Sequence, residues 1–405
     1  MKPRGLIGSR MTAIMRQMSI KSLALLKSVV QHLEFRRKQT RRHKRTSRSS
    51  SVSTTKFVCA HRGDGVATRL LTIIYARIFA EAIGFDLKVI WPKLGHPHSL
   101  YYGNSRLFDP ELKHKIFSND YVFEDATTLR GDFVSKNSID SGRTLSSWDE
   151  RERPSDIASE EFQARSNDFD VVWYDRPYPL LQSLTYDVDF PSEVKRLWKC
   201  IGWNRAITQF IDEISARLPL REFIAVHVRR GDIVKMLIEA DIEHLRHPGM
   251  VQIFQRYTAI DTVISAIDRI RNGEKILLAC EDRKVKALLV RKYGADAVYS
   301  TYDLFSGAGG QRAIVDIILL SKAKILIGPF ISYFSKCAGE VGDCRYIPLE
   351  LDLPPLVEEL LEIANLAHDE RQSSVKALIC KTAAELASDE LMRSRFEEGA
   401  QAFAR

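Results

Sequence analysis

Two adjacent arginines follow a segment that predicts a buried strand. Residues 223–228 are almost all apolar or β-branched, and Arg229, Arg230, a glycine and Asp232 come directly after them. In open α/β sheets, ligands bind outside the carboxyl ends of the strands. A guanidinium group binds phosphate through paired hydrogen bonds, so two arginines at this place suit a diphosphate. We therefore expect a nucleoside-diphosphate site here, with solvated surface charge as the alternative.

Three more polar side chains stand in or next to apolar segments. His227 lies within the strand, either as a satisfied core group or as a ligand. Asp282 follows the apolar run 275–280 and either binds the ligand or caps the next helix. Asp316 lies midway along an apolar helical pattern, where a buried carboxylate needs a partner.

A glycine turn near the start of the chain is a second candidate site. A strand at 56–60 leads through Gly65 into a helix that ends at Gly84, and a strand at 87–91 follows. This is a βαβ pattern, in which an anion or a sugar can meet the amino terminus of the helix. A plain tight turn explains the glycines equally well.

Strands alternate with helices again in the second half of the chain. We expect helices at 191–218, 250–271, 285–293 and 313–320, strands at 275–280, 297–299 and 324–327, a polar segment at 239–247, and C-terminal helices over 353–405. This rhythm predicts a parallel, doubly wound sheet. Two such units in succession favour an α/β protein of two lobes with its site between them.

The intervening residues 93–190 show no regular pattern. They include the aromatic run 171–178, in which Asp175 and Arg176 lie between the Trp-Tyr pair and Tyr178. Aromatic rings of this kind either bind a sugar acceptor or pack in the core. The sequence leaves both interpretations open.

Charge is distributed unevenly over the 405 residues. Residues 1–56 hold fifteen Lys and Arg and one acidic residue, whereas the rest hold 45 basic and 51 acidic residues. The folded body is therefore mildly acidic, which argues against nucleic acid as its substrate. The six cysteines form no Cys-x-x-Cys pair, a pattern that fits a reducing compartment and offers no zinc site; Cys337 and Cys344 could pair if oxidised.

The basic tail consists of two parts. Apolar residues recur at helical spacing over 11–33, and a Ser/Arg-rich stretch follows over 36–53. No apolar run approaches the ~20 residues that span a bilayer. We expect a cytoplasmic protein whose tail contacts the inner membrane surface; a poor signal peptide and a wrongly chosen start codon are the alternatives.

Four segments in order resemble the α1,6- and protein O-fucosyltransferases, including the nodulation-factor fucosyltransferases. Residues 227–232 are similar to that family's first signature, 277–282 to its strand ending in an acidic pair, and 312–332 to its last signature. Residues 65–70 resemble its Gly-x-Gly-x-x-Leu turn, with Ala67 in place of the second glycine. The resemblance implies a GT-B fold, two Rossmann-like lobes around a cleft, and GDP-fucose as donor without a metal or other cofactor.

The resemblance also implies roles for individual residues. Arg229 would bind the β-phosphate and neutralise the departing diphosphate. The other donor-binding residues would be His227, Arg230, Asp232, Asp282, Asp316, Ser332, Gly65 and Arg69. The catalytic base would be Glu239, with Asp241 and Glu243 as rivals. The chain departs from the family at Ile233, where a Lys is common and Lys235 is the substitute, and at Ile331, where a first serine is common.

The sequence therefore predicts four regions and one activity. The regions are a basic tail (1–55), an amino-terminal lobe on the acceptor side (56–215), a nucleotide-sugar lobe (216–352) and C-terminal helices (353–405). The activity is inverting transfer of fucose from GDP-fucose to a glycan or related hydroxyl acceptor. A different nucleotide sugar, or a relative that binds a nucleotide or a partner without catalysis, remains the alternative.

Overall fold

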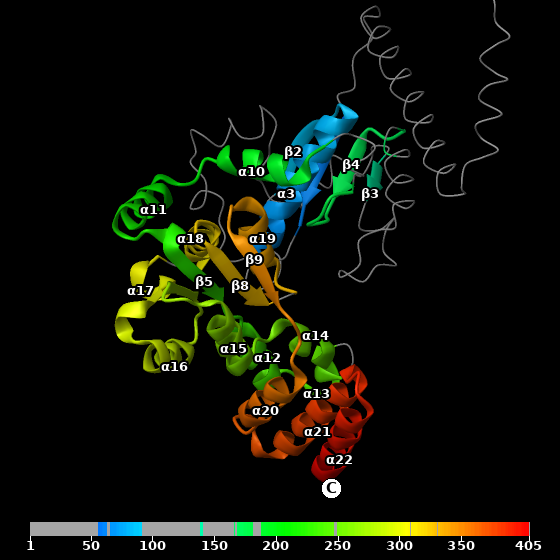
Figure 1. The fold of residues 1–405 in the computed structure, drawn as a ribbon. Coiled ribbons are helices and arrows are strands. Elements are labelled where there is room, and N and C mark those ends of the chain that lie inside the picture. The colour runs from blue at the N-terminus through cyan, green and yellow to red at the C-terminus, as the bar shows by residue number, and fades with distance from the viewer. Residues whose placement is uncertain are drawn as a thin grey trace, which may run out of the picture. The chain divides into compact units, whose positions relative to one another are not determined.

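Two parallel sheets organise the computed structural model of the chain (Figure 1). The structure describes residues 56–62, 65–90, 138–140, 166, 168–180, 188–246, 249–307, 309–329 and 331–404. The predicted basic tail lies outside these residues. Within them, no helix is both long enough and apolar enough to cross a bilayer.

The first sheet contains the predicted βαβ unit. Its strands are β1 (Phe57–His61), β2 (Asp86–Ile90), β3 (Ser138–Asp140) and β4 (Val171–Tyr174), in the order β2-β1-β4-β3 with every pair parallel. Helix α3 (Val66–Ile83) connects β1 to β2 and is buried along most of its length. It ends where Gly84 adopts φ 73°, a left-handed conformation that glycine accepts without strain.

The second sheet is the Rossmann-like half that positions the candidate site. Its strands are β5 (Phe223–His227), β6 (Lys275–Ala279), β7 (Val298–Ser300), β8 (Ile325–Pro329) and β9 (Arg345–Leu349). Their order is β7-β6-β5-β8-β9, and all neighbours are parallel. The chain builds outward from β5 on one side and then crosses to β8 on the other. The point where the strand order reverses therefore lies between β5 and β8.

Helices connect these strands and cover the sheet. They are α15 (Ile260–Ile270), α16 (Arg283–Tyr293), α17 (Thr301–Leu304), α18 (Gly309–Ser321) and α19 (Tyr333–Val341), with the 3-10 turns η3 (Leu220–Glu222) and η4 (Ala295–Ala297). Ile224, Val226 and Val228 pack in one apolar cluster with α15 and α16. Helices α18 and α19 contact β5 and β8 respectively.

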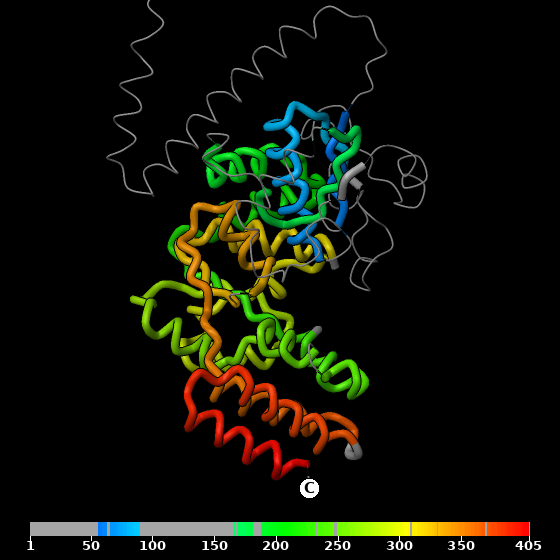
Figure 2. The backbone as a smooth tube through the Cα atoms, turned by 90° about the vertical axis from the view of Figure 1, so that its right-hand side faces the viewer, coloured from blue at the N-terminus to red at the C-terminus, as the bar shows by residue number. Residues whose placement is uncertain are grey.

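A layer of helices completes the fold. Helices α20 (Leu353–Ala364), α21 (Asp369–Leu386) and α22 (Glu390–Ala404) share one apolar cluster with α12 (Gly231–Glu239), α13 (Ile242–Leu245) and α14 (Gly249–Arg256). Figure 2 shows the last three helices running alongside one another at the end of the chain. The C-terminal helices therefore pack on segments that directly follow β5. The four predicted region boundaries stay predictions.

The α/β class with parallel sheets and C-terminal helices is confirmed, but several element predictions were wrong. Residues 231–239, expected to start with a turn and to lead into the polar segment 239–247, form α12, in which Ile233 and Leu237 are buried on one face. The single helix expected over 250–271 is interrupted between α14 and α15. The helix expected over 191–218 is two helices, α10 (Phe190–Lys199) and α11 (Arg205–Arg217), because Asn204 accepts the Ala206 N–H and starts a new helix. Strands β3, β4 and β9 were not expected.

The cysteines are thiols in the structure. All six are free, and all except Cys200 are buried. Cys337 and Cys344 are therefore unpaired with each other, and burial raises the pKa of Cys344 to about 11. The buried thiols are core residues.

Candidate functional site

The carboxyl ends of β5 and β8 bring two helix amino termini together. Helix α12 begins at Gly231, with three residues between it and β5, and α19 begins at Tyr333, with three residues between it and β8. The two strands are neighbours in the sheet. Unpaired N–H groups and the helix dipole make a helix amino terminus attractive to anions. Two of them at the point where strand order reverses form a suitable place for a diphosphate.

His227 is held at this edge by α19. Its Nδ1 lies 2.6 Å from the Ser335 hydroxyl, and its ring packs against Phe334 with centroids 4.7 Å apart. Gly328 on β8 permits this approach, since a Cβ there would lie 2.3 Å from Ser335 Oγ. His227 is only 9% exposed. It is therefore a fixed group at the strand end, as a core role and a ligand role both require.

Arg229 follows two residues later and is half-buried. Val228 donates its N–H to Ala279 at 3.1 Å, which continues the β5–β6 pairing, and its side chain joins the apolar cluster beneath α15. Because successive side chains of an extended segment alternate between faces, we infer that Arg229 lies on the side of His227. This is the side of α19 and the candidate anion site.

Arg230 does not behave as the sequence predicts. Instead of presenting its guanidinium to a phosphate, it is 8% exposed and paired with Asp282 (Nε to Oδ2, 3.3 Å) and with Glu359 of α20. Asp282 also accepts the Lys284 N–H at 2.8 Å and caps α16. The helix-capping interpretation of Asp282 is thus confirmed, and both residues take part in structural contacts.

Asp316 lies further along the same edge of the sheet, near Thr301, the residue that follows β7. It belongs to α18, is 7% exposed, and its Oδ1 has no hydrogen-bond partner among the described residues. Burial raises the pKa of Asp316 to about 7, while the Thr301 hydroxyl and the Arg312 charge act in the opposite direction. Thr301 follows β7, two strands from β5, or about 10 Å across the sheet. A nucleoside diphosphate is long enough to reach both places.

Ser332 is the residue before α19. Its side chain is 1% exposed, and its hydroxyl finds no hydrogen-bond partner among the described residues. Its backbone is fixed, because its N–H binds Pro329 O at 3.2 Å and its C=O accepts the Lys336 N–H at 2.9 Å. A buried hydroxyl without a partner costs free energy that a ligand could recover.

Gly65 and Arg69 belong to the carboxyl edge of the first sheet. Gly65 precedes α3, and Arg69 closes the first turn of that helix with 2% exposure. Arg62 donates to Asp175 O at 2.6 Å, which joins the ends of β1 and β4. Tyr75 of α3 donates to Glu340 of α19 at 2.8 Å, so the helix that carries Arg69 contacts the helix that starts at the candidate anion site.

The aromatic run is largely core. Tyr174 is fully buried, donates to Tyr178 O at 2.7 Å, and its hydroxyl accepts the Leu180 N–H at 3.2 Å. Tyr178 is 3% exposed, and burial raises its pKa to about 12. Of the two interpretations that the sequence left open, the structure therefore favours packing for these two tyrosines.

The predicted base is remote from the candidate anion site. Glu239 ends α12, whose rise of about 1.5 Å per residue places it about 12 Å from Gly231. Its side chain is 63% exposed and lies 3.7 Å from Lys235 Nζ. The rivals Asp241 and Glu243 lie further along the chain and are 88% and 73% exposed. The side chain of Asp232 lies outside the described residues.

Three residues near the site were missed from the sequence. Ser335 holds His227, Glu359 holds Arg230, and the Glu281 carboxylate lies against Gly231, where a Cβ would come within 1.9 Å of it. Local signals existed for Glu281, the first residue of the acidic pair after the apolar run 275–280, and for Glu359. Glu359 falls on the face of α20 that carries the buried Leu356 and Ile363, where a carboxylate is unexpected.

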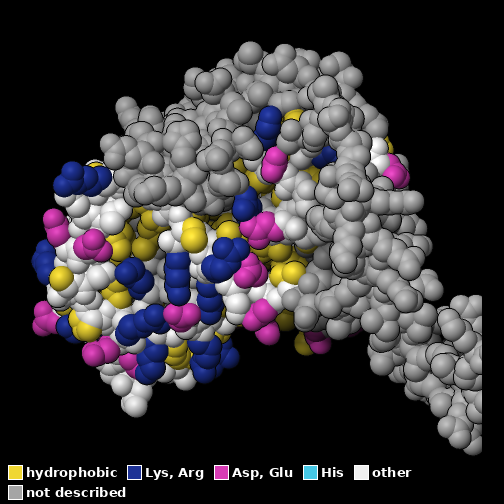
Figure 3. All heavy atoms as spheres, turned by 90° about the horizontal axis from the view of Figure 1, so that it is seen from above, with side chains coloured by type: hydrophobic (Ala, Val, Ile, Leu, Met, Phe, Trp, Pro, Cys, Tyr) yellow, Lys and Arg dark blue, Asp and Glu magenta, His cyan; other side chains and the backbone are white. Residues whose placement is uncertain are grey.

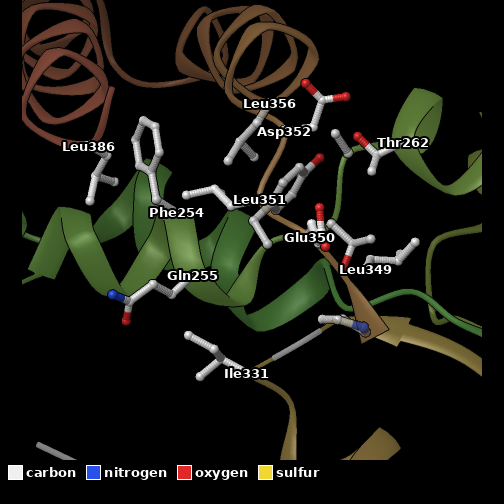
Figure 4. Close-up of a pocket in the computed structure, with 14 residues that line it drawn as sticks. Phe254, Gln255, Thr262, Ile331, Leu349, Glu350, Leu351, Asp352, Leu356 and Leu386 are labelled. Carbon is white, nitrogen blue, oxygen red and sulfur yellow. The ribbon is translucent and has the colours of Figure 1, made fainter. Parts of the chain in front are cut away.

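A pocket of about 290 Å³ opens beside the ends of β8 and β9. Figure 4 shows that α14 and the segment that joins β9 to α20 contribute lining side chains, together with Thr262, Ile331, Leu356 and Leu386. Its described lining residues include Glu350 and Asp352 but no Lys, Arg or His. It is therefore unsuited to a diphosphate.

The surface seen from above in Figure 3 carries acidic and basic side chains interspersed on its described part.

No protein-family model matches the chain, and no curated protein sequence matches it. Solved structures do resemble it. Fucosyltransferase NodZ from Bradyrhizobium is 19% identical, with 73% of this chain and 96% of that chain covered and a TM-score of 0.46. A variant of Arabidopsis thaliana FUT1 in complex with GDP is 13% identical, with 74% and 71% covered and a TM-score of 0.48. POFUT1 in complex with GDP is 13% identical, with 74% and 99% covered and a TM-score of 0.37.

Proposed function

We propose that this chain is a glycosyltransferase that transfers fucose from GDP-fucose to a hydroxyl acceptor, with inversion at the sugar carbon. One observation carries the proposal. The amino termini of α12 and α19, His227 and Arg229 gather at the β5–β8 edge, where the strand order of a parallel sheet reverses. The four resembling sequence segments supply the choice of donor.

The chemistry assigns each group a task. Transfer builds positive charge on the sugar ring and negative charge on the departing diphosphate. Arg229 and the N–H groups that begin α19 would stabilise that negative charge, and Ser332 would add a hydroxyl donor. His227 would orient the nucleotide, and Asp316 would contact the guanine. The base that accepts the acceptor's proton is left unassigned, because Glu239 lies at the far end of α12.

A panel of nucleotides tests the donor. Thermal unfolding is measured with GDP, UDP, ADP and CMP, each well above its expected dissociation constant. A ligand at about 100 times its dissociation constant stabilises the folded chain by about 2.7 kcal/mol, which raises the melting temperature measurably. We expect the largest rise with GDP. A rise with UDP and none with GDP would contradict the fucose donor, and no rise with any of the four would contradict the nucleotide site.

A further inference from the structure

Arg230 lies between two carboxylates that come from distant parts of the chain. Its Nε is 3.3 Å from Asp282 Oδ2, after β6, and its Nη2 contacts Glu359 Oε1 on α20. The guanidinium also lies over the ring of Tyr257, 5.1 Å from the centroid. Only 10% of the Arg230 side chain and 15% of the Glu359 side chain are exposed. Water therefore screens this cluster weakly.

Each carboxylate also binds the amino terminus of a helix. Asp282 Oδ1 accepts the Lys284 N–H at 2.8 Å in α16, and Glu359 Oε2 accepts the Ile260 N–H at 2.9 Å in α15. The end of β5, two helices that cover the sheet and the C-terminal helix α20 are thus joined at one guanidinium. Two carboxylates compensate its charge, which explains why Arg230 is a poor candidate for a phosphate ligand.

The cluster holds the residue next to Arg229. Val228 and Arg230 both lie on the α15 side of the strand, so the residue between them is directed to the side of α19. Because Arg229 is the single residue between Val228 and Arg230, holding both neighbours on the α15 side directs its side chain to the opposite side. We propose that Glu359 is a positioning residue, which acts through Arg230 to hold Arg229 toward the diphosphate. This inference rests on the proposed function.

The experiment compares Glu359→Gln with Glu358→Gln in the full chain. Glutamine at position 359 keeps an oxygen for the Ile260 N–H and removes the charge that pairs with Arg230. Glu358 is an exposed neighbour on the same helix and serves as the matched control. The readouts are hydrogen exchange of a peptide covering residues 226–234, and GDP release from GDP-fucose with water as acceptor.

For Glu359→Gln we expect faster exchange in that peptide, with the rest of the chain unchanged. We also expect kcat for GDP release to fall about tenfold to a hundredfold, and the KM for GDP-fucose to change less, because a misplaced cation fails chiefly in the transition state. Glu358→Gln should match wild type in both. Asp282→Asn, which also removes one charge and keeps a capping oxygen, should repeat the local effect.

Each of the other outcomes contradicts either the positioning role of Glu359 or the proposed function. Unchanged exchange at 226–234 in Glu359→Gln, or a rise spread evenly over the chain, overturns the positioning role whatever the activity. If wild type neither binds GDP nor releases it from GDP-fucose, the proposed function fails. Faster local exchange would even then support the link from Glu359 to the end of β5.

Discussion

The imidazole of His227 and the hydroxyl of Ser335 lie 2.6 Å apart and join the end of β5 to helix α19. Gly328 lies beneath this contact on β8, with no room for a side chain. The three residues come from three elements, yet they set where α19 begins relative to the end of β5. The candidate anion site depends on that placement.

Gly328→Ala should therefore destabilise the chain. Its Cβ would lie 2.3 Å from Ser335 Oγ and 2.7 Å from Ser335 Cβ, so α19 must shift. Overpacking of this kind costs about 1–3 kcal/mol, which chemical denaturation measures. Gly65→Ala is the comparison, since its Cβ would meet nothing closer than Thr68 Oγ1 at 3.9 Å. Equal stability of the two variants would contradict the close packing of α19.

Arg229→Ala should abolish most donor chemistry. Removing a group that stabilises transition-state charge typically lowers the rate about 10²- to 10³-fold. GDP release from GDP-fucose measures the loss, and the thermal melting point should stay near that of wild type because Arg229 is only half-buried. Arg283→Ala, an exposed cation that begins α16, should retain wild-type rates. Full activity in Arg229→Ala would overturn the catalytic interpretation.

Asp316 should make stability depend on pH. Burial raises its pKa to about 7, whereas an unfolded Asp titrates near 4, so the folded state holds a proton that the unfolded state has lost between these values. The stability from this group is complete below about pH 4 and is lost as pH rises to about 7. Asp316→Asn, which does not ionise, should therefore gain stability relative to wild type from pH 5 to pH 8.

Urea denaturation at several pH values checks this difference. The exposed Asp303→Asn provides the comparison, because its carboxylate pairs with Lys286 at the surface and should show a much smaller trend. A constant difference between Asp316→Asn and wild type from pH 5 to pH 8 would show that Asp316 is ionised in the folded chain throughout.

Glu281→Gln should strengthen GDP binding. The Glu281 carboxylate lies against Gly231 at the amino terminus of α12, where it competes with an incoming diphosphate for positive potential. Removing a charge there is worth about 0.3–1 kcal/mol, or roughly a twofold to fivefold gain in affinity. Calorimetry at low salt measures the gain, which should shrink as salt is added.

Glu222→Gln is the matched variant for this measurement. Glu222 is exposed and lies in η3, just before β5, at the opposite edge of the sheet from α12. Its charge should not influence the dissociation constant of GDP. Equal effects of the two substitutions would mean that Glu281 acts only through the overall charge of the chain.

Local sequence determined strands β1, β2, β5, β6, β7 and β8, most helices and the position of Arg229. The apolar run before His227 and the glycine at position 84 act over a few residues, so their outcome is readable without the fold. Tertiary structure decided that Arg230 pairs with two carboxylates, which leaves Arg229 as the candidate phosphate ligand. Tertiary structure also decided the break between α14 and α15, because the carboxylate that accepts the Ile260 N–H comes from α20. Glu359 makes both contacts. Its place on the buried face of α20 is visible in the sequence, but its partners are not, because they meet it only after the C-terminal helices have packed.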